Sequence, residues 1–185
     1  MTEPSYHHGD LRRAIMAAAV GAITESGPAS WSLRELARRA GVSHAAPAHH
    51  FGDKTGLLTA VAAEGYALFA DALERAGDDF YDVGIAYVRF AVDHRAHFEV
   101  IFRPELYRAD DPEVAAARQR ANQVLARGAR SVAPGRAEGD QTAAIAAWSI
   151  VHGFAHLWLS GAFPDGLGDD PEAAAGPVIR LLFTD

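Results

Sequence analysis

The chain has 185 residues, of which 49% are hydrophobic and 22% charged, so it can bury a globular core and is not expected to be disordered. It contains no cysteine, which excludes a disulfide framework, a thiolate metal site and a cysteine nucleophile. The net charge of −7 argues against indiscriminate binding to nucleic acid.

Charge is unevenly distributed along the chain. Residues 1–60 contain six basic and five acidic side chains, together with five of the nine histidines. The other 125 residues contain 11 basic and 19 acidic side chains. This asymmetry predicts that an anionic partner binds the N-terminal third and is repelled by the rest.

Two apolar segments could be mistaken for membrane-directing sequences. Residues 14–23 follow two arginines as in a signal peptide, but they are rich in alanine and have acidic residues upstream. Residues 142–163 carry no formal charge and are long enough to span a bilayer, but they include two histidines and two glycines. We therefore expect a cytoplasmic protein without a membrane partner, in which residues 142–163 form a helix covered by protein.

Glycine and proline divide the chain into helical segments, and no alternating strand pattern is visible, which predicts an all-α fold. The first helix is expected from about Asp10, a good N-terminal cap, to Ser26. Ser32 and Glu35 have the spacing of a capping box, which predicts a second helix ending near Ala40.

The next two helices are predicted from their caps. Ser43 is expected to cap a short helix that ends near His50, and Asp53 to cap a longer helix from Lys54. Further helices are expected at about 80–94, 95–102, 112–132 and 142–161, and from 171 to the end. A loop is expected over Ala133–Gly139, and Pro177 should kink or interrupt the last helix.

Gly41-Val42 joins the two short helices into a helix-turn-helix, whose second helix is the natural candidate for the DNA major groove. This pattern also occurs in helical hairpins that never bind DNA, so by itself it leaves DNA binding open.

Three segments, in the same order and spacing as in the family, resemble the DNA-binding domain of the tetracycline-repressor (TetR) family. They are Tyr6–Arg12 (YHHGDLR), Ser32–Ser43 (SLRELARRAGVS) and His50–Lys54 (HFGDK). In addition, Trp148 with His152-Gly153 resembles the Trp-His-Gly signature of one C-terminal subclass.

The resemblance implies about nine helices in two domains, a three-helix DNA-binding domain over 1–53 and a helical ligand-binding and dimerisation domain over 54–185. It implies a homodimer on a pseudo-palindromic, double-stranded DNA operator, a small-molecule effector and no enzymatic activity. It also favours repression over activation.

Carried over residue by residue, the resemblance places these residues at the DNA: Arg34, Ser43, His44, Ala45, His49, His50 and Lys54. Those at 43–45 would contact base edges or phosphates, and those at 49, 50 and 54 the backbone. Two departures are Pro47, inside the short helix, and Ala48, where many members have a tyrosine. Because few long donors remain, we expect DNA shape and methyl contacts to contribute to sequence readout.

The expected ligand is a small apolar or aromatic molecule in a cavity enclosed by helices 4 to 8 of the chain. The candidate lining residues are Phe69, Tyr87, Phe90, Phe102, Trp148 and His152. Aromatic side chains fill the core by default, so whether these residues line a cavity stays open.

The uncharged helix over 142–161 is apolar on both sides and must therefore be covered on both sides. One cover can be the domain's own core, and the other is expected to be a second copy of the chain. The candidate interface residues are Phe154, Ala155, Leu157 and Leu159, and which face meets the partner stays open.

Two other functions remain as alternatives, a helical enzyme that uses His152 or His156 as a base, and a helical protein-interaction module. No carboxylate pair, nucleophile or phosphate-cradling loop supports the first. The histidines near the second short helix have no carboxylates at ligand spacing, so neither a metal nor another cofactor is expected.

Overall fold

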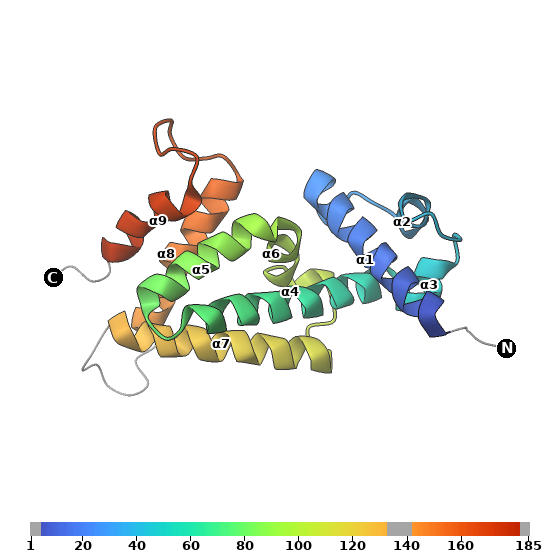
Figure 1. The fold of residues 1–185 in the computed structure, drawn as a ribbon, viewed down its shortest axis with the longest axis horizontal. Coiled ribbons are helices and arrows are strands. Elements are labelled where there is room, and N and C mark those ends of the chain that lie inside the picture. The colour runs from blue at the N-terminus through green and yellow to red at the C-terminus, as the bar shows by residue number, and fades with distance from the viewer. Residues whose placement is uncertain (1–4, 133–141, 182–185) are drawn as a thin grey trace. The chain divides into compact units, whose positions relative to one another are not determined.

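The computed structural model describes residues 5–132 and 142–181, and the side chains of residues 10–128 and 142–181. All regular structure in these ranges is helical (Figure 1), which confirms the predicted all-α fold of about nine helices. The helices are α1 (Ser5–Ser26), α2 (Leu33–Arg39), α3 (Ala46–Phe51), α4 (Lys54–Ala76), α5 (Phe80–Asp93), α6 (Arg95–Ile101), α7 (Pro112–Val132), α8 (Thr142–Leu159) and α9 (Pro171–Arg180), with a 3-10 turn η1 (Pro104–Leu106) before α7.

Two of the four predicted capping residues cap their helices, as expected for a local interaction. The Ser32 hydroxyl accepts a hydrogen bond from Glu35 N at 3.2 Å at the start of α2. The Asp53 carboxylate accepts one from Gly56 N at 2.6 Å at the start of α4. Both side chains satisfy backbone N–H groups that have no partner within the helix.

Two predicted helix starts are wrong. α1 begins before Asp10, whose carboxylate pairs with Arg13 at 2.5 Å instead of capping the helix. α3 begins at Ala46, after a turn in which Ala46 N donates to Ser43 O at 3.0 Å. Pro47, which lacks an N–H and has a fixed φ, suits the first turn of a helix, so Ser43 lies too far upstream to cap α3.

α9 continues through Pro177 to Arg180, so the predicted interruption is wrong, whereas the alternative of a kink stays a prediction. Packing of α9 against α5 and α8 compensates for the hydrogen bond that proline removes. The loop predicted over Ala133–Gly139 lies outside the described residues.

The chain forms two compact units that interleave along the sequence, residues 1–65 with 96–115, and residues 66–95 with 116–185. In the first unit, α1, α2 and α3 pack against one another. Because α4 and α7 contribute to both units, this division does not test the domains predicted over 1–53 and 54–185, which stay a prediction.

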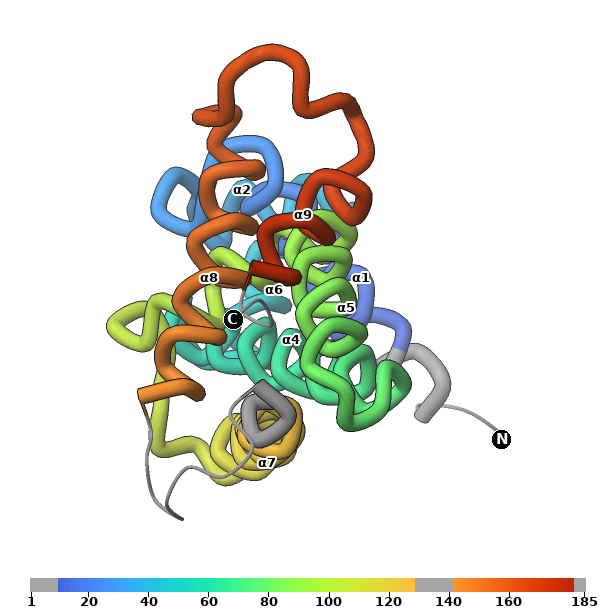
Figure 2. The backbone as a smooth tube through the Cα atoms, turned by 90° about the vertical axis from the view of Figure 1, so that its left-hand side faces the viewer, coloured from blue at the N-terminus to red at the C-terminus, as the bar shows by residue number. Residues whose placement is uncertain are grey.

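In the second unit, α5 packs against both α8 and α9, and Figure 2 shows these three helices side by side. A Cβ at Gly84 of α5 would lie 3.0 Å from Ile179 Cδ1 and 3.3 Å from Val151 Cγ1, so a larger residue would require these side chains to shift by a few tenths of an ångström. α7 is attached to α4 by Arg120, which pairs with Asp71 and Glu74 at 2.8 and 2.7 Å.

By length and composition alone, α4 and α8 could cross a membrane. More than half of the apolar stretch of α4 is buried within the described fold, as in the core helix of a soluble protein, whereas much less of α8 is buried. The chain's own fold therefore accounts for the apolar character of α4 but not fully for that of α8.

Candidate DNA-binding head and aromatic ligand site

We define the N-terminal head as α1, α2, α3 and the first turn of α4. Gly41, between α2 and α3, has φ +67°, a left-handed conformation that glycine adopts without strain. Leu36 and Ala37 of α2 and Ala46 and Pro47 of α3 are buried, so both short helices have an inner side that holds them against α1. Arg34, Arg38 and His49 are exposed on the same two helices.

The predicted DNA contacts lie mostly on the surface of the head. Ser43, His44 and Ala45 are exposed in the turn that enters α3, and His49 is exposed one turn later. Arg34 is exposed on α2, whereas His50 at the end of α3 is only half-buried. The structure thus brings Ser43, His44 and Ala45 together at the exposed N-terminal edge of α3, while His49 and His50 lie in its second half.

Lys54 has a structural attachment that the sequence did not predict. Its Nζ donates to Ala29 O at 2.9 Å and Trp31 O at 3.0 Å, and it lies 4.2 Å from the centre of the Trp31 ring. Burial lowers the pKa of the Lys54 ammonium. Two of its three donors therefore bind the loop before α2, which leaves one for a phosphate.

Ion pairs fix much of the remaining positive charge of the head. Arg39 binds Glu25 at 2.6 Å and Glu35 at 3.0 Å, and the hydrogen bonds to these carboxylates raise the pKa of Arg39. Arg12 lies over the Phe51 ring at 5.2 Å. These contacts hold α1, α2 and α3 together, so Arg39 contributes little free charge for DNA.

Five of the six predicted ligand residues form one cluster in the second unit, which we call the aromatic cluster: Phe69, Tyr87, Phe90, Trp148 and His152. The Phe69 ring packs 5.0 Å from Tyr87 and 4.8 Å from Phe90, and all three are fully buried. The sixth residue, Phe102, lies in the other unit and packs 5.0 Å from Phe98.

A hydrogen-bonded chain runs through the aromatic cluster from its core to its edge. Trp148 Nε1 donates to the Tyr87 hydroxyl at 3.2 Å, and that hydroxyl lies 2.9 Å from His152 Nδ1. Burial raises the pKa of Tyr87 and lowers the pKa of His152, so both groups are held neutral. With Nδ1 as acceptor, His152 carries its proton on Nε2.

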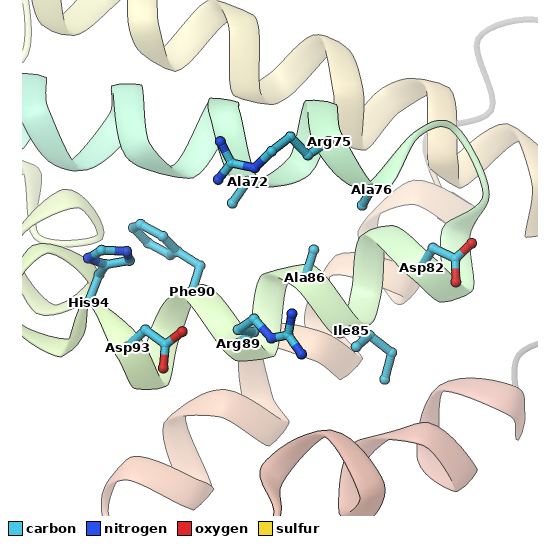
Figure 3. A pocket seen from close by; sticks show the side chains of 10 residues that line it. All are labelled: Ala72, Arg75, Ala76, Asp82, Ile85, Ala86, Arg89, Phe90, Asp93 and His94. Atoms are coloured by element: carbon cyan, nitrogen blue, oxygen red, sulfur yellow. The ribbon is translucent and has the colours of Figure 1, made fainter.

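A pocket of about 400 Å³ opens between α4 and α5 beside this cluster (Figure 3). Its lining residues are Ala72, Arg75, Ala76, Asp82, Ile85, Ala86, Arg89, Phe90, Asp93 and His94. The alanines leave the space open, while the charged side chains surround it and Phe90 connects it to the aromatic cluster. Apart from Phe90, sequence reasoning missed these residues, because a gap between small side chains has no periodic signal.

The four predicted interface residues of α8 differ in exposure. Phe154 and Ala155 are buried in their own chain, and Phe154 packs 5.0 Å from Phe163. Leu157 is 43% exposed, and Leu159 is partly exposed. A second copy of the chain could therefore contact Leu157 directly, but not Phe154 or Ala155 without rearrangement.

Comparison with known proteins identifies the family. Residues 15–61 match the model for bacterial regulatory proteins of the tetR family, and residues 80–182 match the tetracyclin repressor-like C-terminal domain. No curated protein sequence matches the chain.

Solved structures of other proteins share this fold over nearly the whole chain. A protein of unknown function from Rhodococcus sp. RHA1 is 31% identical, with a TM-score of 0.76 over 98% of this chain and 97% of that chain. A bacterial regulatory protein in the tetR family from Rhodococcus RHA1 is 25% identical, with a TM-score of 0.71 over 94% and 95%. The TetR-like transcriptional regulator LfrR from Mycobacterium smegmatis, in complex with proflavine, shares the fold at 19% identity, with a TM-score of 0.63 over 95% and 96%.

The C-terminal match alone covers more than half of the chain, and the N-terminal match covers the helix-turn-helix described above. The chain therefore belongs to the TetR family of transcriptional regulators.

Proposed function

We propose that this regulator is a cytoplasmic homodimeric repressor that binds a pseudo-palindromic operator and releases it when a small apolar or aromatic molecule binds its C-terminal helices. The observation that carries the proposal is the shared exposure of Ser43, His44, Ala45 and His49 at the edge of α3, while the inner side of the same helix is buried. This arrangement presents the candidate base-contacting side chains at the start of a supported helix, as major-groove recognition requires.

Dimerisation is proposed from the apolar side chains that α8 exposes, Ile145 and Trp148 on one side near its start and Leu157 on the opposite side near its end. Ile145, Trp148 and Leu157 are 56%, 45% and 43% exposed on a helix without a charged side chain. Covering them with a second chain would remove apolar surface from water. In this arrangement Leu157 lies in the interface and Leu159 at its margin, while Phe154 and Ala155 support the helix from within.

The ligand is proposed to enter the α4–α5 pocket and to act on the aromatic cluster through Phe90. LfrR was solved with proflavine, a flat aromatic cation, and the proposal extends this class of ligand to the present chain. Ligand binding would lower DNA affinity if the ligand prefers a conformation in which the two heads are misplaced.

The enzymatic alternative has little geometric support. His152 Nδ1 lies against the Tyr87 hydroxyl rather than a carboxylate, and His156 is exposed. Within the described residues, no group of three histidine or acidic side chains could hold a metal ion. The proposal therefore assigns no catalytic role to either histidine.

The proposal is tested by selecting duplexes from a random DNA library with the full chain and footprinting the enriched sequence. We expect a pseudo-palindrome whose half-sites are separated by about one helical turn, roughly 10 base pairs. Equal, weak binding to every duplex would contradict the proposal. Proflavine then serves as the ligand probe. Ala86→Phe, which fills the pocket, should weaken proflavine binding more than Ala116→Phe, which changes an exposed position of α7.

A further inference from the structure

The start of α4 is held by a residue far away in the sequence. Arg108, in the turn between η1 and α7, donates from Nη2 to both oxygens of the Asp53 carboxylate, at 3.1 and 3.0 Å. Asp53 also caps α4, since the same carboxylate accepts from Gly56 N at 2.6 Å. Because α3 ends two residues before Asp53, this ion pair lies where α3 passes into α4.

Three positions at the start of α4, the capping residue 53 and residues 56 and 59 of the helix, contact Arg108. The Thr59 hydroxyl accepts a hydrogen bond from Arg108 N at 3.0 Å. A Cβ at Gly56 would lie 2.0 Å from the backbone oxygen of Phe51, so the junction of α3 and α4 requires glycine there, and it would lie 3.0 Å from Arg108 Nη1. Arg108 is therefore attached to α4 by both its backbone and its side chain.

The turn that carries Arg108 is itself anchored. The preceding residue, Tyr107, is 5% exposed, and its hydroxyl donates to Ile101 O at 2.9 Å. Asp111 N donates back to Arg108 O at 3.1 Å. Because its backbone is fixed, Arg108 can hold Asp53 in place instead of following it.

The ion pair of Arg108 with Asp53 also changes the charge at the start of α4. Asp53 is exposed at the end of α4 that is proposed to approach a DNA phosphate, where an unpaired carboxylate would repel the DNA. The nearest cation in sequence, Lys54, is bound to the carbonyl oxygens of Ala29 and Trp31. The Arg108 guanidinium is thus the group that neutralises Asp53.

We infer that Arg108 is a positioning residue for DNA binding, which acts through Asp53 to fix the junction of α3 and α4 and to cancel the charge of the cap. This inference rests on the proposed DNA-binding function. It assigns a role in the head to a residue that lies outside the helix-turn-helix in sequence.

A double-mutant cycle tests this role, with the full chain and a duplex enriched by the wild-type protein as the probe. Arg108→Ala should weaken DNA binding about fivefold, because Asp53 loses its partner. Arg108→Lys should weaken it less, because lysine keeps the charge but not both hydrogen bonds. In the background of Asp53→Asn, which keeps a capping side chain but removes its charge, Arg108→Ala should change affinity less than about twofold. Arg103→Ala removes the same charge from a pair with exposed Glu105 and should leave affinity unchanged.

Hydrogen exchange separates positioning from a direct DNA contact. Without DNA, Arg108→Ala should speed amide exchange in peptides covering residues 52–60, whereas peptides from α9 stay unchanged. An unchanged affinity, or an equal loss of affinity in both Asp53 backgrounds, would overturn the inference while leaving the proposed function intact. If the wild-type chain enriches no duplex, the proposed function fails and the inference fails with it. Arg108→Lys keeps the test decisive if the alanine variant does not fold.

Discussion

Replacing Tyr87 by phenylalanine removes one buried hydroxyl and keeps the ring that packs against Phe69. The hydroxyl takes part in two hydrogen bonds, with Trp148 Nε1 at 3.2 Å and with His152 Nδ1 at 2.9 Å. A neutral hydrogen bond contributes about 0.5–1.5 kcal/mol, and both partners lie close enough to solvent to regain water. We therefore expect Tyr87→Phe to lower the free energy of unfolding by about 1–2 kcal/mol.

The assay is urea unfolding followed by circular dichroism, at one protein concentration for all variants because the proposed dimerisation would contribute to stability. Tyr81→Phe is the matched control, since its hydroxyl accepts from Arg180 Nη2 at 3.1 Å near solvent and the Arg180 guanidinium stays over the ring. The control should change the free energy of unfolding by less than about 0.5 kcal/mol. Equal effects of the two substitutions would refute the structural role assigned to the Tyr87 hydroxyl.

The remaining predictions concern the head, the dimer and pH. Lys54→Ala should weaken binding to all DNA sequences and lower its salt dependence, whereas His44→Ala should change base preference, as duplex titrations at several salt concentrations can measure. Leu157→Glu should dissociate the dimer in sedimentation while each chain stays folded, whereas Phe154→Glu should unfold the chain, because only the first residue is exposed. Burial lowers the pKa of His152 in the folded state, so stability should be constant above about pH 6.5 and fall as the pH drops below it. His152→Gln should reduce this loss when unfolding is compared at pH 7.5 and pH 5.5, and an unchanged pH dependence would contradict the assignment.

Local chemistry made most of the helices predictable. Ser32 and Asp53 each cap the helix that they were predicted to begin, because a side-chain acceptor near free N–H groups depends only on neighbouring residues. Ser43 has the same chemistry but does not cap α3, since Pro47 determines where the first turn begins. Competing local signals therefore limited the prediction of α3.

Aromatic composition, taken with the family resemblance, predicted part of the aromatic cluster. It named Phe69, Tyr87 and Phe90 as candidates, and the structure brings their rings into contact. It could not separate Phe102, which is equally aromatic but packs in a different unit. Helical spacing identifies which side of a helix is covered, but the partner depends on how helices from distant parts of the chain pack.

Residues that act through distant partners left no sequence signal. Arg108 and Asp53 are 55 positions apart, and neither belongs to a pattern that predicts the other. Likewise, Ala72 and Ala86 open the α4–α5 pocket only because the two helices lie side by side. Such sites require the tertiary structure, since each depends on the distance between segments rather than on the composition of either one.

The position of Trp148 connects the proposed interface with the aromatic cluster. Its ring is 45% exposed on α8, while its Nε1 donates to the buried Tyr87 hydroxyl, which in turn contacts half-buried His152. Any molecule that covers the exposed side of Trp148, whether a second chain or a ligand, would also remove water from the edge of this hydrogen-bonded chain. Desolvation already lowers the pKa of His152. Further covering would lower this pKa more and would make the neutral imidazole still more favourable than the protonated one. Dimerisation and the neutral state of the aromatic cluster would then favour each other. Covering Trp148 removes water from beside His152, whereas a protonated His152 needs that water to solvate its charge.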